Sequence, residues 1–179
     1  MTAHPDQVYG PQFDYRRGSP HLRDPRLFAR VASSLERAVT EIARTHGRCR
    51  ALEIGAGHGS FTTILRRAGA KVVATEMSAA SAARMSQQFE DDANVLVIHD
   101  QNGDWLFEND ISIDLCACIS VLHHIPDYMR TIRRVTELTQ PGGAFISWQD
   151  PTWYPRGSRT QRLASTASYL AWRITQGNY

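Results

Sequence analysis

A glycine-rich loop between two apolar segments is the part of the sequence best suited to chemistry. Residues 51–60 read ALEIGAGHGS, in which a short apolar run ends in a carboxylate and three glycines alternate with other residues. A β-strand that enters a helix through such a loop brings backbone N–H groups close to a ligand. Glycine is needed because a Cβ atom would block the tight turn or the ligand. The loop predicts a site for a nucleotide-like ligand.

The loop is compatible with two classes of nucleotide-like ligand. A dinucleotide fingerprint requires a glycine at the sixth position of Gly-x-Gly-x-x-Gly, where this sequence has Ser60. The spacing of Gly55, Gly57 and Gly59, with Glu53 two residues before the first glycine, instead resembles motif I of class I S-adenosylmethionine-dependent methyltransferases. A glycine motif alone is weak, so the downstream residues must distinguish the two classes.

The downstream residues favour the methyltransferase family. Glu76 follows Gly55 by 21 residues at the end of the next predicted strand, where a carboxylate can bind ribose hydroxyls in either class. The segment 113–127, IDLCACISVLHHIPD, resembles motif IV of the small-molecule branch of the methyltransferases. Residues 141–143, Pro-Gly-Gly, match a further signature of that family. The resemblance covers roughly residues 50–150 and implies a natural-product or quinone-like methyl acceptor.

The resemblance implies cofactor-binding roles for residues in the glycine loop and at the ends of the strands. These residues are Glu53, Gly55, Ala56, Gly57, Gly59, Glu76, Met77, Asp100, Gln101 and Ser120. Glu53 would orient the methionine part through its ammonium group, and Glu76 would hold the ribose. Met77, Asp100 and Gln101 would frame the adenine. The alternatives are a strand-end carboxylate that caps nearby amides for Glu53, and a solvated turn for Asp100 and Gln101.

Two adjacent histidines are the candidate catalytic residues. Methyl transfer from a sulfonium needs alignment above all, and it needs a base only where the acceptor must lose a proton. Histidine titrates in the right range for that work. His124 is the first candidate and His123 the second, and at most one of them should face the acceptor because neighbours at a strand end point different ways. In the alternative interpretation both only satisfy local hydrogen bonds. No residues have metal-ligand spacing.

Alternating strand and helix patterns indicate how these residues are brought together. A helix is predicted from Asp24, as N-cap, and Pro25 to Gly47. Five β-rich segments then alternate with helical ones, at residues 50–54, 71–75, 94–99, 114–121 and 144–148. This order predicts an α/β fold with a Rossmann-like, doubly wound, mostly parallel sheet.

Three regions are predicted along the chain. Residues 1–24 form a leader or a lid, residues 25–151 the S-adenosylmethionine-binding α/β domain, and residues 152–179 a helical segment with its helix over 159–175. The family's sheet has seven strands, and no pattern for the last two follows residue 148. We therefore expect a truncated chain whose own activity is in doubt.

The amino-acid composition argues against several classes of binding partner. A net charge of +2 is too small to imply a polyanionic partner, and no apolar run approaches the ~20 residues of a membrane span. Three cysteines do not form a disulfide framework, so a cytoplasmic location is expected. We expect S-adenosylmethionine as cofactor and a small organic acceptor, without nucleic acid or membrane; the oligomeric state is not predicted. The alternatives are a non-catalytic binding module or inactive fragment, and a nicotinamide-dependent oxidoreductase.

Overall fold

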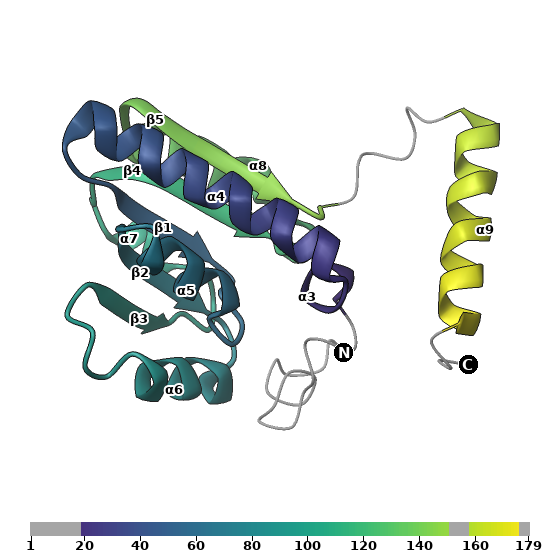
Figure 1. Cartoon of the computed structure of the whole chain (residues 1–179), viewed down its shortest axis with the longest axis horizontal. Coiled ribbons are helices and arrows are strands. Elements are labelled where there is room, and N and C mark those ends of the chain that lie inside the picture. The colour runs from purple at the N-terminus through teal and green to yellow at the C-terminus, as the bar shows by residue number, and fades with distance from the viewer. Residues whose placement is uncertain (1–18, 151–157, 176–179) are drawn as a thin grey trace.

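Five strands form one sheet in the computed structural model of the chain, which describes residues 19–150 and 158–175 (Figure 1). The strands are β1 (Arg50–Ile54), β2 (Lys71–Glu76), β3 (Val95–His99), β4 (Ile113–Ile119) and β5 (Thr139–Trp148). They lie in the order β3-β2-β1-β4-β5, and every pair is parallel. The order reverses between β1 and β4, where ligands bind in open sheets of this kind. The predicted doubly wound α/β fold is confirmed.

Helices cover both faces of the sheet. The helices in the described part of the chain are α3 (Pro20–Arg23), α4 (Pro25–His46), α5 (Ser60–Arg67), α6 (Ala79–Gln88), α7 (Trp105–Glu108), α8 (Tyr128–Leu138) and α9 (Arg159–Thr175), with a short 3-10 helix η1 (Leu122–His124). Side chains of α4, α5 and α6 pack on one face, and those of α7 and α8 pack on the other. The site must therefore lie at an end of the sheet, because both faces are occupied.

The central strand β4 is buried along its whole length, as its continuous apolar sequence predicts. Its side chains alternate between the faces: Leu115 and Ala117 join the core under α4, whereas Cys116 and Cys118 join the core under α8. The three cysteines are free and buried. Burial on both faces gives β4 one register against β1, and this register fixes where its last residues emerge.

Capping residues set the ends of the helices that flank the site. The carboxylate of Asp24 accepts hydrogen bonds from the N–H groups of Arg26 and Leu27 at the start of α4, and Gly47 ends that helix at φ 72°. The backbone N–H of Asp24 donates to Pro20 O, so the same residue ends α3. Ser78 caps α6. The predicted cap at Asp24 is confirmed.

The structure differs from the predicted elements near β5. The strand begins at Thr139 rather than Ala144, so that Pro141 and Gly142 lie within it, and the register against β4 shifts between Ile113 and Leu115. An edge strand tolerates proline because one of its sides needs no ladder hydrogen bond. The helix α8 starts after Asp127, whose carboxylate accepts the N–H of Arg130, and not at Pro126. The four-residue α7 was not predicted because it is too short to show a period.

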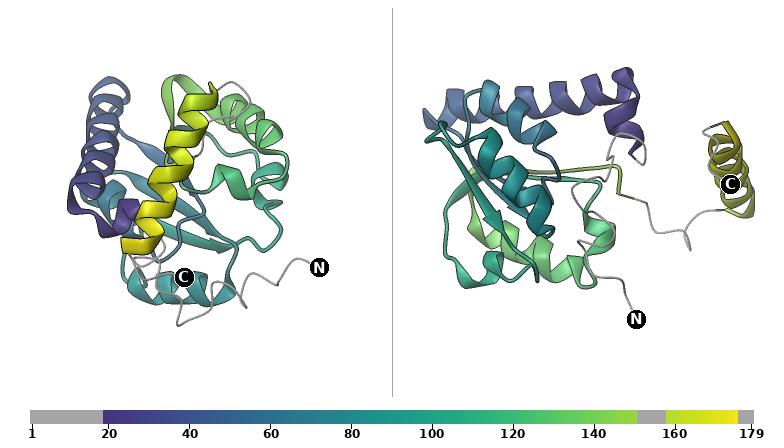
Figure 2. Two further views of the ribbon diagram at one scale, coloured as in Figure 1. Left: turned by 90° about the vertical axis from the view of Figure 1, so that its right-hand side faces the viewer. Right: turned by 90° about the horizontal axis from the view of Figure 1, so that it is seen from below.

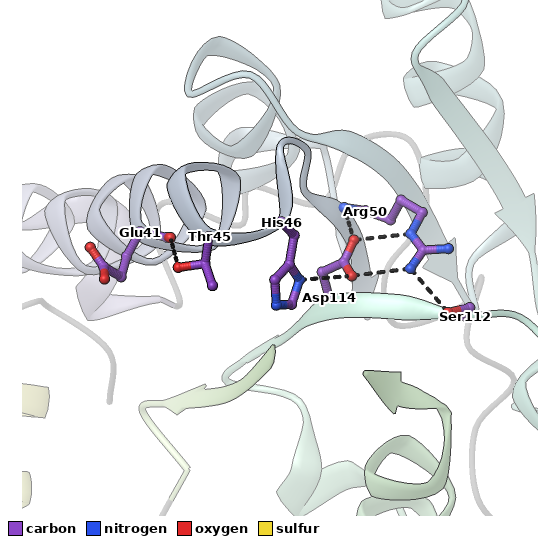
Figure 3. A network of polar contacts seen from close by, with 6 residues as sticks. All are labelled: Glu41, Thr45, His46, Arg50, Ser112 and Asp114. Carbon is purple, nitrogen blue, oxygen red and sulfur yellow. Dashed lines mark hydrogen bonds and ion pairs between the residues drawn. The ribbon is translucent and has the colours of Figure 1, made fainter. Parts of the chain in front are cut away.

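A polar network closes the amino-terminal end of the sheet (Figure 3). Asp114, at the start of β4, is 2% exposed and accepts hydrogen bonds from the backbone N–H and the guanidinium of Arg50, at 2.9–3.0 Å. His46 Nδ1 lies 3.4 Å from the same carboxylate, and the guanidinium also donates to Ser112. The network ties the end of α4 to β1 and β4.

The predicted helix over 159–175 is confirmed as α9, which stands apart from the sheet (Figures 1 and 2). Leu163, Leu170 and Ile174 are exposed along it. Among the described helices none is both long and apolar enough to span a bilayer. The predicted leader falls outside the described residues except for 19–24, which include α3.

Candidate functional site

A cavity of about 310 Å³ lies where β1, β2 and β4 end. The glycine loop and the ends of β2 and β4 line it, together with residues of α3 and of η1. All three strands are parallel, so their carboxyl ends meet at this edge of the sheet. The structure thus brings together most of the predicted site residues in one place.

The backbone of the glycine loop is held against the ends of β2 and β4. Gly55 has φ 69°, and a Cβ atom at this position would lie 2.3 Å from Val121 Cγ2. The N–H groups of Gly55 and Ala56 both donate to Thr75 O, at 2.9 and 3.0 Å. Only glycine fits position 55, because both the positive φ and the close approach of Val121 exclude a side chain.

Glu76 connects the end of β2 to this loop. Its Oε2 accepts the N–H of Gly57 at 2.8 Å, and its Oε1 accepts the N–H of Ser78 at 2.9 Å. The side chain is 7% exposed, and burial raises its pKa while these backbone hydrogen bonds oppose the rise. Each carboxylate oxygen has further acceptor capacity, so Glu76 can also accept hydrogen bonds from two hydroxyl groups in the cavity.

Glu53 is a second buried carboxyl group in the wall of the cavity. It is 2% exposed, and its Oε2 accepts the hydroxyl of Thr62 at 2.5 Å. Burial raises the pKa of Glu53 to about 8; the Thr62 hydrogen bond opposes this shift, and the charge of Glu76 adds to it. A cationic ligand in the cavity would stabilise the carboxylate form. The alternative, a carboxylate that caps backbone amides, is not what the structure shows.

Two of the three predicted adenine-binding residues, Met77 and Asp100, line a second cavity of about 190 Å³. It shares Met77 and His124 with the first cavity. Asp100 lines it, but its Oδ1 accepts the N–H groups of Asp104 and Trp105 at 3.0 and 3.3 Å, so this carboxylate also holds the turn before α7. Gln101 is exposed in that turn. The roles of Asp100 and Gln101 toward a base remain predictions.

Ser120 has an uncommon backbone conformation directly after β4. Its φ is 58°, in the left-handed region, and its N–H donates to Trp148 O at 2.7 Å. Such strain in a non-glycine residue is found mainly at functional sites. The conformation turns the chain from β4 into η1, which places both candidate histidines at the cavity.

The two histidines differ in their partners. His123 Nδ1 lies 2.9 Å from Asp150 Oδ1, and that carboxylate also accepts the hydroxyl of Ser147 at 2.6 Å. Burial lowers the pKa of His124, and the charge of His123 lowers it further. The two rings lie 4.0 Å apart between centroids. The Asp150 carboxylate orients His123, although His124 was predicted from the sequence as the first candidate for the base.

Sequence reasoning missed two residues of the site. Asp150 follows β5, and the rule that parallel strands end at one edge of the sheet could have placed it beside His123. His21 lies on the short helix α3, is 4% exposed and lines the cavity. No signal pointed to His21, because its segment shows no period.

A family comparison decides between the ligand classes. The family described as "Methyltransferase domain" matches residues 52–147, which is more than half of the chain. The chain belongs to this family of class I S-adenosylmethionine-dependent methyltransferases. The match runs from β1 to β5 and therefore includes the whole cavity wall that the sheet provides.

Individual relatives agree with this membership. The methyltransferase chain is 30% identical over 96 residues to a ubiquinone biosynthesis O-methyltransferase of Aromatoleum aromaticum, covering 52% of the chain and 41% of that protein. It is 28% identical over 170 residues to the highly reducing polyketide synthase ACTTS3 of Alternaria alternata, covering 82% of the chain and 7% of the synthase. The chain thus spans less than half of either relative.

A solved structure has the same fold at low sequence identity. The S-adenosylmethionine-dependent methyltransferase of Thiobacillus denitrificans, crystallised with S-adenosyl-L-homocysteine, superposes with a TM-score of 0.57 at 21% identity. The match covers 77% of the methyltransferase chain and 54% of that structure. It agrees with the predicted fold class.

The residues of the cavity fit the cofactor of the family, S-adenosylmethionine. Glu76 presents a carboxylate that can accept hydrogen bonds from the ribose, and Glu53 is a buried carboxyl group without a cationic partner among the described residues. The cofactor carries an ammonium group, which matches the charge of a Glu53 carboxylate. No cluster of ligands for a metal ion occurs within residues 19–150 and 158–175.

Proposed function

We propose that this chain binds S-adenosylmethionine and transfers its methyl group to a small organic acceptor. The observation that carries the proposal is one cavity lined by the glycine loop, by Glu76 and by His123, whose Nδ1 pairs with Asp150. The cofactor supplies a methyl group on a positively charged sulfur, which makes that carbon electrophilic. Glu76 and the loop hold the cofactor, and the residues after β4 and β5 face the acceptor.

His123 is the proposed general base for an acceptor that must lose a proton. Its Nδ1–H donates to Asp150, which keeps the proton on that nitrogen and leaves Nε2 free to accept one from the acceptor. Asp150 also stabilises the imidazolium that forms, because its carboxylate lies 2.9 Å away. His123 is partly exposed, so an acceptor can reach it. His124, whose pKa is lowered by burial, is the second candidate.

The names of two relatives and the proposed base support one class of acceptor. One relative is a ubiquinone biosynthesis O-methyltransferase and another is a polyketide synthase. Both names support a phenolic, enolic or activated-carbon acceptor on a natural-product or quinone-like molecule. Such a group is acidic enough for a histidine to remove its proton during transfer.

Cofactor binding is the first test. Calorimetric titration of the chain with S-adenosyl-L-homocysteine should give micromolar binding, and NADH in parallel should give none. Binding of NADH alone would overturn the proposal. Binding of S-adenosyl-L-homocysteine without turnover of any acceptor would leave a non-catalytic binding module.

Turnover then tests the base. With a phenolic acceptor, His123→Gln should lower kcat by about a hundredfold or more, because a positioned base contributes 10²–10⁴-fold. Affinity for S-adenosyl-L-homocysteine should not change. His124→Gln is the matched control and should have the smaller effect on kcat. A larger loss with His124→Gln would assign the base to that residue instead.

A further inference from the structure

An unpaired nitrogen atom lies in the wall of the cavity, on the side formed by α3. The side chain of His21 is 4% exposed, and its Nδ1 has no hydrogen-bond partner among the described residues. A buried polar atom without a partner has lost its hydration without gaining a hydrogen bond, and few such atoms persist in native proteins. His21 is one of the residues that line the cavity. A buried, unpaired nitrogen beside a cavity points to a ligand.

Aromatic stacking fixes the orientation of this ring. The His21 imidazole stacks on Phe61 of α5, with ring centroids 5.9 Å apart and an interplanar angle of 28°. Phe61 in turn stacks on Phe28 of α4, at 5.3 Å and 22°. Asp24 joins α3 to α4, so the backbone of His21 is also anchored. The ring therefore keeps its place at the cavity and does not depend on a hydrogen bond for its orientation.

We propose that His21 binds the methyl acceptor through a hydrogen bond between its Nδ1 and a hydroxyl group of that molecule. The inference rests on the proposed function and adds to it the residue that positions the acceptor oxygen. In the reacting arrangement Nδ1–H of His21 donates to the hydroxyl oxygen, so that the hydroxyl proton stays available for His123 to remove.

The surroundings of His21 favour the acceptor over the cofactor. Burial lowers the pKa of His21, while a side-chain hydrogen bond between the ring and Gln149 and the charge of Asp150 act in the opposite direction. Asp150 is the carboxylate that orients His123, so His21 lies near the proposed base. A neutral ring close to Asp150 is a poor partner for the anionic carboxylate of the cofactor.

A hydroxyl group also matches the chemistry of a neutral imidazole. One ring nitrogen of a neutral histidine donates a hydrogen bond and the other accepts one, depending on the tautomer. Gln149 lies close enough to act on the ring but can present either its oxygen or its nitrogen. A hydroxyl both donates and accepts, so it can pair with Nδ1 in either tautomer, whereas a carbonyl or carboxylate can pair with only one.

The test measures binding of a phenolic probe to the chain saturated with S-adenosyl-L-homocysteine. The probe is 4-nitrocatechol, titrated by its absorbance. His21→Phe keeps an aromatic ring on Phe61 and removes both nitrogens, whereas His21→Asn keeps a polar atom near the position of Nδ1. Arg23→Gln is the matched control, because Arg23 is exposed on the same helix. Thermal unfolding by circular dichroism checks each fold, and His21→Leu replaces His21→Phe should the phenylalanine disturb it.

We expect His21→Phe to weaken probe binding by about tenfold, the loss of one hydrogen bond. His21→Asn should recover part of this loss, and affinity for S-adenosyl-L-homocysteine should stay the same in every variant. Equal probe affinity in all variants, or no probe binding to the wild-type complex, would overturn the inference. A parallel loss of affinity for S-adenosyl-L-homocysteine would overturn it by assigning His21 to the cofactor. Failure of the wild type to bind S-adenosyl-L-homocysteine at all would instead overturn the proposed function, and the inference with it.

Discussion

Buried carboxyl groups lie at both ends of the parallel sheet, in opposite electrostatic settings. At the amino-terminal end, Asp114 is paired with the Arg50 guanidinium, which lowers the pKa of this carboxyl to about 2 (Figure 3). At the carboxyl end, the hydrogen bonds that Glu53 and Glu76 accept from the described residues come from a hydroxyl and from backbone N–H groups, and burial raises the pKa of both. At the amino-terminal end, an arginine of the protein neutralises the carboxylate charge. At the carboxyl end, that role is left to a ligand.

The amino-terminal end of the sheet therefore contributes to stability, and the carboxyl end contributes to ligand binding. A carboxylate paired with arginine holds α4, β1 and β4 together and needs nothing further. Two buried acids without a cation raise the free energy of the folded chain, and a cationic ligand recovers that free energy when it binds. Substitutions at the two ends should therefore affect different measurements.

The largest expected effect is on stability, at the amino-terminal end. Asp114→Ala should lower the free energy of unfolding by about 3 kcal/mol, because Arg50 loses its counter-ion and its backbone N–H loses an acceptor. Urea unfolding followed by circular dichroism measures this loss. Asp110→Ala is the control, since Asp110 is 92% exposed in its ion pair with Arg134 and should cost less than about 1 kcal/mol. Equal losses in the two variants would contradict a structural role for the network.

The next effect is a pH dependence at the carboxyl end. The pKa of Glu53 is raised from 4.5 to about 8 in the folded chain, so between these values the unfolded chain releases a proton that the folded chain keeps. Stability must therefore fall as the pH rises through this window. Relative to Glu53→Gln, wild type should lose about 2 kcal/mol of unfolding free energy between about pH 6 and pH 8. Parallel curves for the two proteins would mean that Glu53 is ionised at neutral pH.

The smallest expected effect is on cofactor affinity. Glu76→Gln should weaken binding of S-adenosyl-L-homocysteine by about 1.4 kcal/mol, or about tenfold, through loss of charge-assisted hydrogen bonds to the ribose. Calorimetric titration measures it, with Glu90→Gln as control because Glu90 is exposed beyond α6. Unchanged affinity in a folded Glu76→Gln variant would remove Glu76 from the ribose role.

Most of the fold could be predicted from the sequence because local rules governed it. Asp24 and Ser78 are caps of an ordinary kind, and the continuous apolar run of β4 allows only a central strand. The start of β5 could not be predicted, since Pro141 and Gly142 indicate a turn unless the strand is known to lie at the edge of the sheet. That position is a property of the whole sheet and not of the segment.

Within the candidate site, only the residues that belong to a recognisable sequence motif could be predicted. The glycine loop and Glu76 lie at the cavity as predicted, because a strand, a tight turn and a helix fix their positions. The pairing of His123 with Asp150 depends on how η1 and the end of β5 meet, 27 residues apart in sequence. His21 depends on stacking between three helices. Contacts between such distant segments produce no recognisable residue pattern in the sequence.

The hydrogen bond from Gly57 to Glu76 has a consequence for the motion of the glycine loop. It joins the loop to β2 through groups of the protein itself, so the loop conformation does not depend on contacts with a ligand. Little conformational entropy is then lost on binding. The Gly57 amide should exchange slowly with solvent deuterium even without ligand, so that association is limited by access to the cavity rather than by folding of the loop.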